Sequence, residues 1–231
     1  MIFSKESAVQ QVCKLLHRYK GLQINSMDER KISLKGEILI NRISLGFTLC
    51  KRYCIEVVIP LDSDELPYVL DIENQIDNSY PHRYVDGKLC LETDTNIRIR
   101  FLNGFSLETW MPEYVETYFF SYEFYQRYGE FPFGERGHGF EGIIQTYSDF
   151  FNETDMGKTI RLMASISTRQ YRGHSQCPCG SGLKLRSCHG PSIMKFYTDN
   201  RLKTIVRKDY FLLEEAVKKY DEQQHNTRAA K

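Results

Sequence analysis

The feature that most constrains how this chain folds is a run of closely spaced cysteines, HSQCPCGSGLKLRSCHG, at residues 174–190. Cys177 and Cys179 are separated by one residue, and Cys188 and His189 follow as a pair. Thiolate sulfur and imidazole nitrogen are the ligands that structural zinc prefers, and four such ligands complete a tetrahedron. A segment this short and polar has no core of its own, so we expect bound metal to supply much of its folding energy, on the order of 10 kcal/mol.

The Gly-Ser-Gly turn at residues 180–182 allows the backbone to fold back tightly, so that amide groups point at the thiolates. A closed set of four ligands leaves no open position, which predicts a structural zinc site. His174 is a spare ligand if His189 faces away, and three free cysteines in a loop are the alternative interpretation. The segment resembles the SEC-C zinc-binding motif, Cys-x-Cys-Gly-Ser-Gly followed by Cys-Cys or Cys-His, which residues 177–190 match throughout.

The chain as a whole has the composition expected of a folded protein that lies outside membranes. Of its 231 residues 41% are hydrophobic and 13% aromatic, which is ample for a packed core. No apolar run approaches the roughly 20 residues that a bilayer requires, and the N-terminus lacks the pattern of a secretory signal. We therefore expect a cytoplasmic protein without a membrane partner, in a reducing compartment where its seven cysteines are not disulfides.

Charge divides the chain into two parts. Residues 1–157 carry 16 basic and 24 acidic side chains, a net charge of −8, and residues 158–231 carry 15 and 6, a net charge of +9. The sequence thus predicts an acidic domain at 1–157 and a basic tail at 158–231 with a zinc module at about 174–190. The tail either contacts the acidic domain or binds an acidic partner. Because the final helix mixes both charge signs, we do not expect nucleic acid as a partner.

Periodicity predicts an α+β fold. Residues 4–20 have helical spacing, with Ser4 as the expected N-terminal cap. Residues 31–40 alternate apolar and polar side chains, and 45–60 are rich in branched and aromatic residues, so we expect an antiparallel meander with a further short strand near 66–75. A loop is expected at 80–91 and at 131–142, and helices at about 112–128, 143–151 and 201–220.

Cys90 is the cysteine best placed for chemistry. It lies in GKLCLE at the end of a loop, where nearby Lys88 and His82 are expected to lower its pKa and favour the nucleophilic thiolate. The alternative is a buried cysteine at a strand end. Three others, Cys13, Cys50 and Cys54, fall in helix-like or strand-like sequence, and we expect them to be packing residues.

The order of helix, strands, loop cysteine, Trp110 and helices resembles the ubiquitin-conjugating-enzyme fold over about residues 1–155. In that family a His-Pro-Asn triplet precedes a Gly-x-x-Cys-Leu segment, with the catalytic cysteine eight positions after the asparagine. Here Tyr80-Pro81-His82 precedes Gly87-Lys88-Leu89-Cys90-Leu91 at the same spacing. The resemblance implies that Cys90 is the catalytic cysteine and that His82 takes the asparagine's place, holding the oxyanion. A solvated loop histidine is the alternative for His82.

The loop FPFGERGHG and the zinc motif together resemble bacterial members of antiphage (CBASS-type) operons, which lie beside cyclic-oligonucleotide synthases. The resemblance implies a thioester-forming enzyme that accepts the activated C-terminal glycine of such a synthase, or of a ubiquitin-like modifier, on Cys90 and passes it to an amine. Because the chain has no Gly-rich phosphate loop, a separate activating enzyme is expected. Glu92, Asp94 and His138 are candidate proton acceptors. The alternative is a catalytically decayed scaffold that binds the synthase without conjugation.

Overall fold

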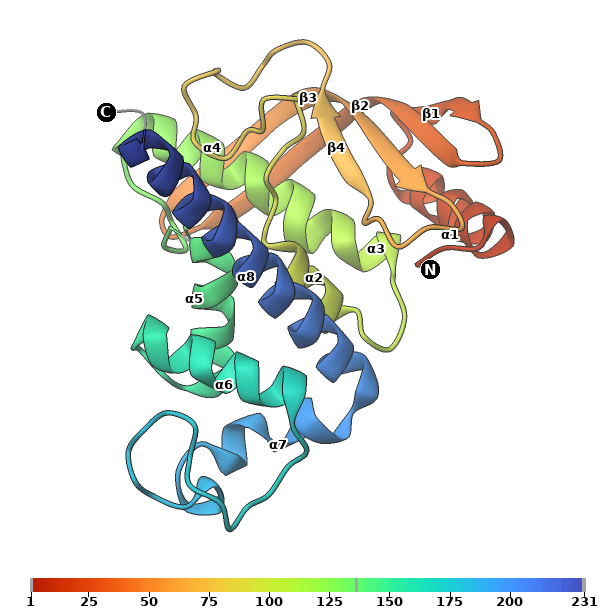
Figure 1. Ribbon diagram of the computed structural model, residues 1–231. Coiled ribbons are helices and arrows are strands. Elements are labelled where there is room, and N and C mark those ends of the chain that lie inside the picture. Colours follow the sequence, from red (N-terminus) through yellow and green to blue (C-terminus); the bar gives the residue numbers. More distant parts are fainter. Residues whose placement is uncertain (1, 136, 230–231) are drawn as a thin grey trace. The chain divides into compact units, whose positions relative to one another are not determined.

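The computed structural model describes residues 2–135 and 137–229, with only the backbone described for 220–229. The chain forms two compact units (Figure 1), the first made of Met1–Asp94 and Asn103–Glu135 and the second of Thr95–Leu102 and Arg136–Lys231. The expected α+β class is confirmed, because an antiparallel sheet and helices are both present. Within the described part of the chain, no helix is both long and apolar enough to cross a membrane.

The first unit begins with the expected helix, α1 (Lys5–Arg18), whose N-terminus is capped by Ser4. The Ser4 hydroxyl accepts a hydrogen bond from the backbone N–H of Ser7 at 3.3 Å, which satisfies one of the amides that a helix start leaves unpaired. The buried stripe of α1 consists of Ala8, Val12 and Leu15. The helix therefore buries a narrower face than its apolar residues suggest.

Four strands form one antiparallel sheet in the order β1-β2-β3-β4. Its centre is the long hairpin of β2 (Lys31–Ser44) and β3 (Phe47–Pro60), flanked by β1 (Leu22–Met27) and β4 (Tyr68–Asp71). The alternation that predicted β2 is confirmed by burial of one face, with at most 1% exposure of its core side chains Ile32, Leu34, Ile38 and Ile40.

Gly36 in β2 fills a position where a side chain does not fit. It has φ +149°, and a Cβ built on it falls 2.0 Å from the carbonyl oxygen of Gly21. The close approach of these two backbones, opposite Leu22 of β1, therefore requires glycine at position 36.

The aromatic-rich segment after the sheet is helical from residue 107 to 128. It consists of α3 (Leu107–Trp110), a π-helical turn at Met111–Val115 and α4 (Glu116–Tyr128), which crosses β2 and β3 in Figure 1. Trp110, Phe119 and Phe120 are fully buried, so aromatic side chains of this segment form part of the core. Gly129 ends α4 in the left-handed conformation with φ 73°.

The second unit is helical. It contains most of α2 (Asp94–Arg100), and then α5 (Gly139–Phe151), α6 (Met156–Thr168), α7 (Gly190–Thr198) and α8 (Asn200–Ala229). Helix α6 packs on α5 and α8, and α7 packs on α5 and α8. At the centre Phe196 lies edge-on to Phe151, with ring centroids 5.3 Å apart.

A carboxylate is buried in this helical core. Asp209 of α8 is 8% exposed, and its Oδ2 accepts hydrogen bonds from the Thr95 hydroxyl at 2.6 Å and the Tyr147 hydroxyl at 2.7 Å. Burial raises the pKa of Asp209, while these two hydrogen bonds act against that rise. The triad joins α2, α5 and α8 within the second unit.

The bounds of the compact units differ from the division at residue 157 that the charge pattern suggested. Helices α5 and α6 share a hydrophobic core with the cysteine-rich segment, through side chains such as Tyr147 and Leu162 that are fully buried with Cys177 and Cys179. Strand β1 and helices α2, α6 and α7 were not individually predicted. They are short or mixed in polarity, and packing rather than periodicity sets their place.

Candidate functional site

The cysteine-rich segment folds into a small hairpin followed by a helix start. The backbone N–H of Cys177 donates to the carbonyl of Leu183 at 2.8 Å, and Gln176 pairs with Lys184. The turn between them contains Gly180 at φ +86°, a conformation that side chains rarely adopt. Cys188 ends a short 3₁₀ turn at Leu185–Ser187, and His189 directly precedes α7.

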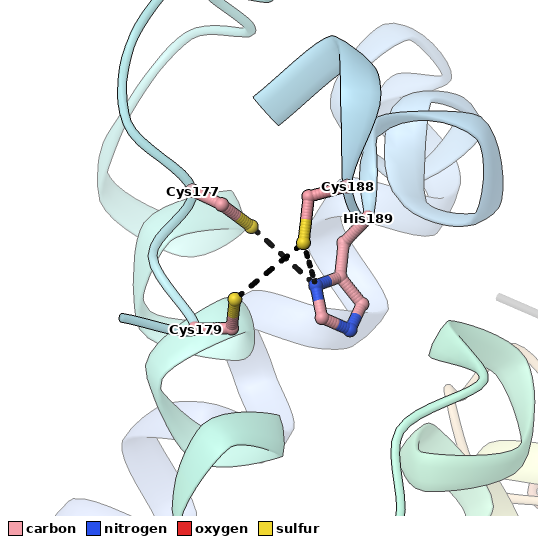
Figure 2. A group of neighbouring side chains, drawn as sticks. All are labelled: Cys177, Cys179, Cys188 and His189. Atoms are coloured by element: carbon pink, nitrogen blue, oxygen red, sulfur yellow. Dashed lines mark hydrogen bonds between the residues drawn. The ribbon is translucent and has the colours of Figure 1, made fainter. Parts of the chain in front are cut away.

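This hairpin gathers the four predicted ligands, whose ligand atoms all lie within 4.8 Å of one another (Figure 2). His189 Nδ1 lies 3.4 Å from Cys177 Sγ and 3.3 Å from Cys188 Sγ, and Cys179 Sγ lies 3.7 Å from Cys188 Sγ. A zinc tetrahedron with bonds of about 2.3 Å to sulfur and about 2.0 Å to nitrogen has S···S edges of about 3.8 Å and S···N edges of about 3.5 Å. The donor set and its spacing therefore fit a tetrahedral metal ion.

Hydrogen bonds to the sulfurs act on the pKa values of the cysteines in this cluster. Some of them come from the Gly-Ser-Gly turn, whose amide groups were expected to point at the thiolates. Burial acts to raise the pKa of Cys179, but hydrogen bonds from the Ser181 hydroxyl and backbone N–H, together with those from the thiols of Cys177 and Cys188, outweigh it and lower that pKa to about 6. Burial raises the pKa of Cys177 to about 11, against hydrogen bonds from the backbone N–H groups of Cys179 and His189. These donors stabilise thiolates, the form in which cysteine binds metal.

The cluster is part of the core of the second unit. Cys177 and Cys179 are 4% and 3% exposed, and they pack with the aromatic and aliphatic side chains of α5–α8. His174, the spare ligand, is exposed and is not a member of the cluster. The structure therefore favours His189 as the fourth ligand.

Cys90 lies in the first unit at the end of a tight backbone turn. The N–H of Tyr84 donates to the carbonyl of Lys88 at 2.9 Å, the N–H of Cys90 donates to the carbonyl of His82 at 2.9 Å, and Arg83 pairs with Leu89. The same segment continues the sheet, since the N–H of Leu89 donates to the carbonyl of Val69 in β4 at 2.9 Å. The expected loop is thus a short antiparallel ribbon on the sheet edge.

The ribbon places His82 directly opposite Cys90. Residues opposite each other in an antiparallel pair project on the same face, and a ring nitrogen of His82 lies within 4.8 Å of Cys90 Sγ. The imidazole is held edge-on to Phe131, with centroids 5.0 Å apart, and its ring also lies 5.6 Å from that of Tyr80. The His82 carbonyl also accepts from the Tyr118 hydroxyl at 3.0 Å. The structure thus brings the two predicted residues together.

The pKa of Cys90 moves in the direction opposite to the expected one. Burial raises it, the negative charges of Glu92 and Asp94 raise it further, and a hydrogen bond from the Tyr84 hydroxyl acts against the rise. The expectation that Lys88 lowers this pKa is wrong, because the Lys88 ammonium lies 3.0 Å from Asp86 Oδ2 and over the ring of Tyr68.

The proton acceptors expected from the motif divide between the two units. Glu92 and Asp94 lie in the first unit, close enough to Cys90 for their charges to act on its thiol. His138 lies in the second unit, where it precedes α5 as the residue at its N-terminus.

Two of the three cysteines expected to be packing residues do not have that role. Cys13 and Cys50 are exposed, and Cys54 is half-buried. In α1 the buried stripe runs through Val12 rather than Cys13, because the core-facing direction is set by Ala8 and Leu15. In β3, Cys50 and Cys54 lie on the sheet face opposite the buried side chains such as Leu49 and Tyr53.

Sequence reasoning did not find two residues that contact these sites. Tyr84 contacts the Cys90 thiol, and its place six residues earlier in the same loop was an available signal. Glu153 lies 3.3 Å from the ligand His189, and no pattern in the sequence links the two.

The structure is that of an α+β protein whose helical second unit contains a cluster of three cysteines and one histidine. We call this cluster, Cys177, Cys179, Cys188 and His189, the metal-type centre, because its donor atoms are those of a metal site. Comparison with protein families identifies that centre more closely, because residues 175–191 match the SEC-C motif. No curated protein and no solved structure matches the chain significantly. The family match covers the metal-type centre and its flanks, and all four gathered ligands fall inside it.

Proposed function

We propose that the chain is a thioester-forming acyl-transfer enzyme of the ubiquitin-conjugating type, with a structural zinc site in its second unit. The observation that carries the proposal is the ribbon at the edge of the sheet, which places the His82 ring within 4.8 Å of the Cys90 thiol. A cysteine with an adjacent imidazole is the arrangement that cysteine-based acyl transfer uses.

In the first step the Cys90 thiol loses its proton and its sulfur attacks the activated carboxyl carbon of a C-terminal glycine. The leaving group departs with the electron pair of its bond to that carbon, and a thioester remains on Cys90. In the second step an amine attacks the thioester carbon, loses a proton and expels the Cys90 thiolate, so that an amide forms. Splitting the transfer in this way lowers each barrier.

His82 has a role in each step. An imidazole N–H donates a hydrogen bond to the oxyanion that forms when the carbonyl is attacked, in the place of the family's asparagine. The His82 ring packs against Phe131, and the hydrogen bond from the Cys90 backbone N–H to the His82 carbonyl fixes the segment that carries the ring. The imidazole is therefore oriented before substrate binds. Because burial raises the pKa of Cys90, a nearby base assists formation of the thiolate.

The residues of the cluster fit zinc, and Cys177, Cys179, Cys188 and His189 would hold it. When bound, zinc supplies folding energy and no reaction step, since four protein ligands fill its coordination. The protein's own part is to keep the thiolates hydrogen-bonded and within the helical core.

We further propose that the acyl donor is the C-terminal glycine of a cyclic-oligonucleotide synthase or a ubiquitin-like modifier in bacterial antiphage defence. This proposal is supported by the spacing of His82 and Cys90 and by the SEC-C motif in the same chain. A separate enzyme activates the glycine, and the expected location is the cytoplasm.

The test is mass spectrometry of the full chain after reaction with a glycine-terminated peptide thioester. Wild-type protein should gain the peptide mass on Cys90, and the adduct should be removed by added thiol. Cys90→Ala, which has no nucleophile at this position, should form no adduct there, and Cys50→Ser, which removes an exposed cysteine, should react like wild type. A thiol-sensitive adduct that persists undiminished in Cys90→Ala would contradict the proposal.

A non-catalytic scaffold is the second candidate, and the raised pKa of Cys90 favours it. In that case no adduct forms in cells or with the thioester probe, and a complex with the synthase survives Cys90→Ala. Recovery of thiol-sensitive Cys90 adducts from cells, with a complex that depends on Cys90, would exclude the scaffold.

A further inference from the structure

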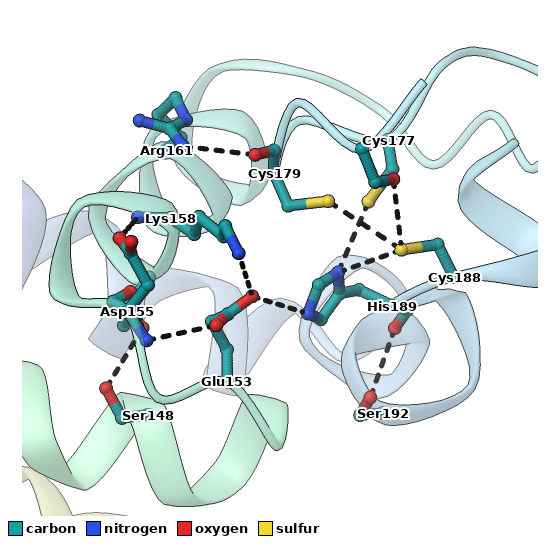
Figure 3. A network of polar contacts seen from close by, with 12 residues as sticks. Ser148, Glu153, Asp155, Lys158, Arg161, Cys177, Cys179, Cys188, His189 and Ser192 are labelled. Carbon is teal, nitrogen blue, oxygen red and sulfur yellow. Dashed lines mark hydrogen bonds and ion pairs between the residues drawn. The ribbon is translucent and has the colours of Figure 1, made fainter. Parts of the chain in front are cut away.

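The metal-type centre includes a carboxylate from outside the SEC-C segment. Glu153 lies in the connection between α5 and α6, and its Oε2 is 3.3 Å from Nε2 of His189 (Figure 3). The other ring nitrogen of His189, Nδ1, faces the sulfurs of Cys177 and Cys188 at 3.4 and 3.3 Å. The two nitrogens of one imidazole thus have different partners, thiolates on one side and a carboxylate on the other.

Both members of this contact are largely removed from water. The side chains of His189 and Glu153 are 12% and 10% exposed, which distinguishes the pair from a surface ion pair. Burial makes the hydrogen bond directional and costly to break, because neither group is readily satisfied by solvent instead.

Glu153 is itself held in place by its own turn. Its Oε1 accepts from the backbone N–H of Asp155 at 3.0 Å, its backbone N–H donates to the carbonyl of Ser148 at 3.0 Å, and the ammonium of Lys158 lies 3.9 Å from Oε2. Asp155 in turn caps α6 by accepting from the N–H of Lys158. The carboxylate therefore has a fixed direction set by the start of α6.

A second contact joins α6 to the metal-type centre. The guanidinium of Arg161 donates to the carbonyl of Cys179 at 3.0 Å (Figure 3). With three thiolates around a divalent ion the centre has a net charge of −1, and Glu153 adds to it. Arg161 and Lys158 place positive charge beside this excess, which allows a carboxylate to stay close to an already anionic site.

We propose that Glu153 is a positioning residue of the metal centre, which accepts the Nε2–H of His189 and thereby directs the Nδ1 lone pair at the metal. A ligand histidine has two tautomers, and the hydrogen bond made by one nitrogen selects which of the two binds. Glu153 selects Nδ1. The centre therefore extends beyond residues 175–191 and ties the SEC-C segment to the α5–α6 turn.

The main experiment measures zinc affinity of the full-length chain by competition with a chelator of known affinity. Glu153→Ala should weaken zinc binding by about 10- to 100-fold, the usual effect of removing such a partner. Glu153→Gln keeps an oxygen acceptor without the charge, so a smaller loss is expected. The matched control is Glu141→Ala, which removes an exposed glutamate of α5 in the same unit. Equal affinities of Glu153→Ala and Glu141→Ala would overturn the proposal.

A second background separates positioning from general stability. In His189→Cys the fourth ligand is a thiolate with no second nitrogen to orient, so Glu153→Ala should weaken zinc binding there by less than about threefold. An equal loss in both backgrounds would show that Glu153 acts through folding rather than through the imidazole, and would overturn the proposal.

Nitrogen-15 NMR of the histidine side chains gives a readout that does not depend on affinity. In the zinc-loaded wild type, His189 should show a proton on Nε2 and metal-shifted Nδ1, and Glu153→Ala should broaden or mix these signals. A protonated Nδ1 in the wild type would overturn the assignment. The inference rests on the proposed metal site: absence of zinc binding by the wild type overturns both, whereas zinc binding that is insensitive to Glu153 overturns this inference alone.

Discussion

In the second unit three cysteines and a histidine lie within 4.8 Å of one another, whereas Cys90 of the first unit is its loop's single cysteine. Hydrogen bonds from Ser181 and from the neighbouring cysteines lower the pKa of Cys179 to about 6, while burial and two carboxylates raise the pKa of Cys90. The comparison shows that burial alone does not decide how a cysteine behaves. Cys177, in the same cluster as Cys179, also receives hydrogen bonds, yet burial raises its pKa to about 11. The balance between burial and the groups around each sulfur therefore decides the direction, and at Cys90 two carboxylates add to burial against the single hydrogen bond from Tyr84.

Removal of the metal should produce the largest difference in folding stability between the two units. Chelation or Cys177→Ser is expected to unfold the hairpin and loosen the core around it, with a loss on the order of 10 kcal/mol of metal-derived folding energy. The antiparallel sheet of the first unit contributes no residue to this ligand cluster and should keep its structure. Hydrogen exchange followed by mass spectrometry measures both units in one sample.

The control for metal removal is Cys50→Ser, since Cys50 is exposed and, among the residues that the structure describes, belongs to no cluster of potential metal ligands. It should leave zinc content and exchange unchanged. If chelation exposes the amides of β2 and β3 as much as those of α6 and α7, the two units do not differ in metal dependence and the comparison fails.

The two aromatic cores give the next largest effect. Phe196→Ala in α7 and Phe119→Ala in α4 each remove a fully buried ring, and each should cost about 3–5 kcal/mol in free energy of unfolding. Only Phe196 shares a core with Cys177 and Cys179, so only its removal should also weaken zinc binding. Denaturant unfolding and chelator competition measure the two quantities. A loss of zinc affinity in Phe119→Ala would contradict this division.

Features of the fold and of the site that depend on residues close together in the sequence were predictable, whereas those that depend on residues far apart in the sequence were not. Ser4, the alternation of residues 32–40 and the spacing of Cys177 to His189 are local patterns, and each predicted its structure. Cys13 was misplaced because apolar spacing leaves the rotation of a helix uncertain by one residue. The His189–Glu153 contact and the direction of the Cys90 pKa depend on residues brought together by folding, which periodicity does not record.

A smaller effect is expected at Asp209, the buried carboxylate of the second unit, which is not one of the proposed metal ligands. Asp209→Ala leaves the hydroxyls of Thr95 and Tyr147 without their shared acceptor, at a cost of about 1–3 kcal/mol. Asp209→Asn keeps an oxygen acceptor and should cost less. Burial raises the pKa of Asp209, so the wild type is stabilised by the protonated acid at low pH, and that contribution is lost as pH rises through the folded-state pKa.

Urea unfolding of zinc-loaded protein between pH 4 and 7 measures this contribution. The difference in unfolding free energy between Asp209→Asn and wild type should shift in favour of the asparagine variant as pH rises, because asparagine carries no charge to bury. A difference that is constant over this range would mean that Asp209 has the same pKa in both states.

The smallest effect concerns the reactivity of Cys90. Its raised pKa predicts that alkylation by iodoacetamide rises with pH to a midpoint above about 8.5, the ordinary value for a thiol. Glu92→Gln removes a negative charge that raises this pKa, so its midpoint should move to lower pH, with a few-fold faster reaction at pH 7.5. Peptide mass spectrometry follows Cys90 separately, with Cys50 as the exposed reference in the same chain.

A Cys90 midpoint below that of an ordinary thiol would mean that His82 stabilises the thiolate more than burial opposes it. The two units would then activate their cysteines by the same principle, a donor beside the sulfur, and differ only in whether a metal ion or an acyl group binds there.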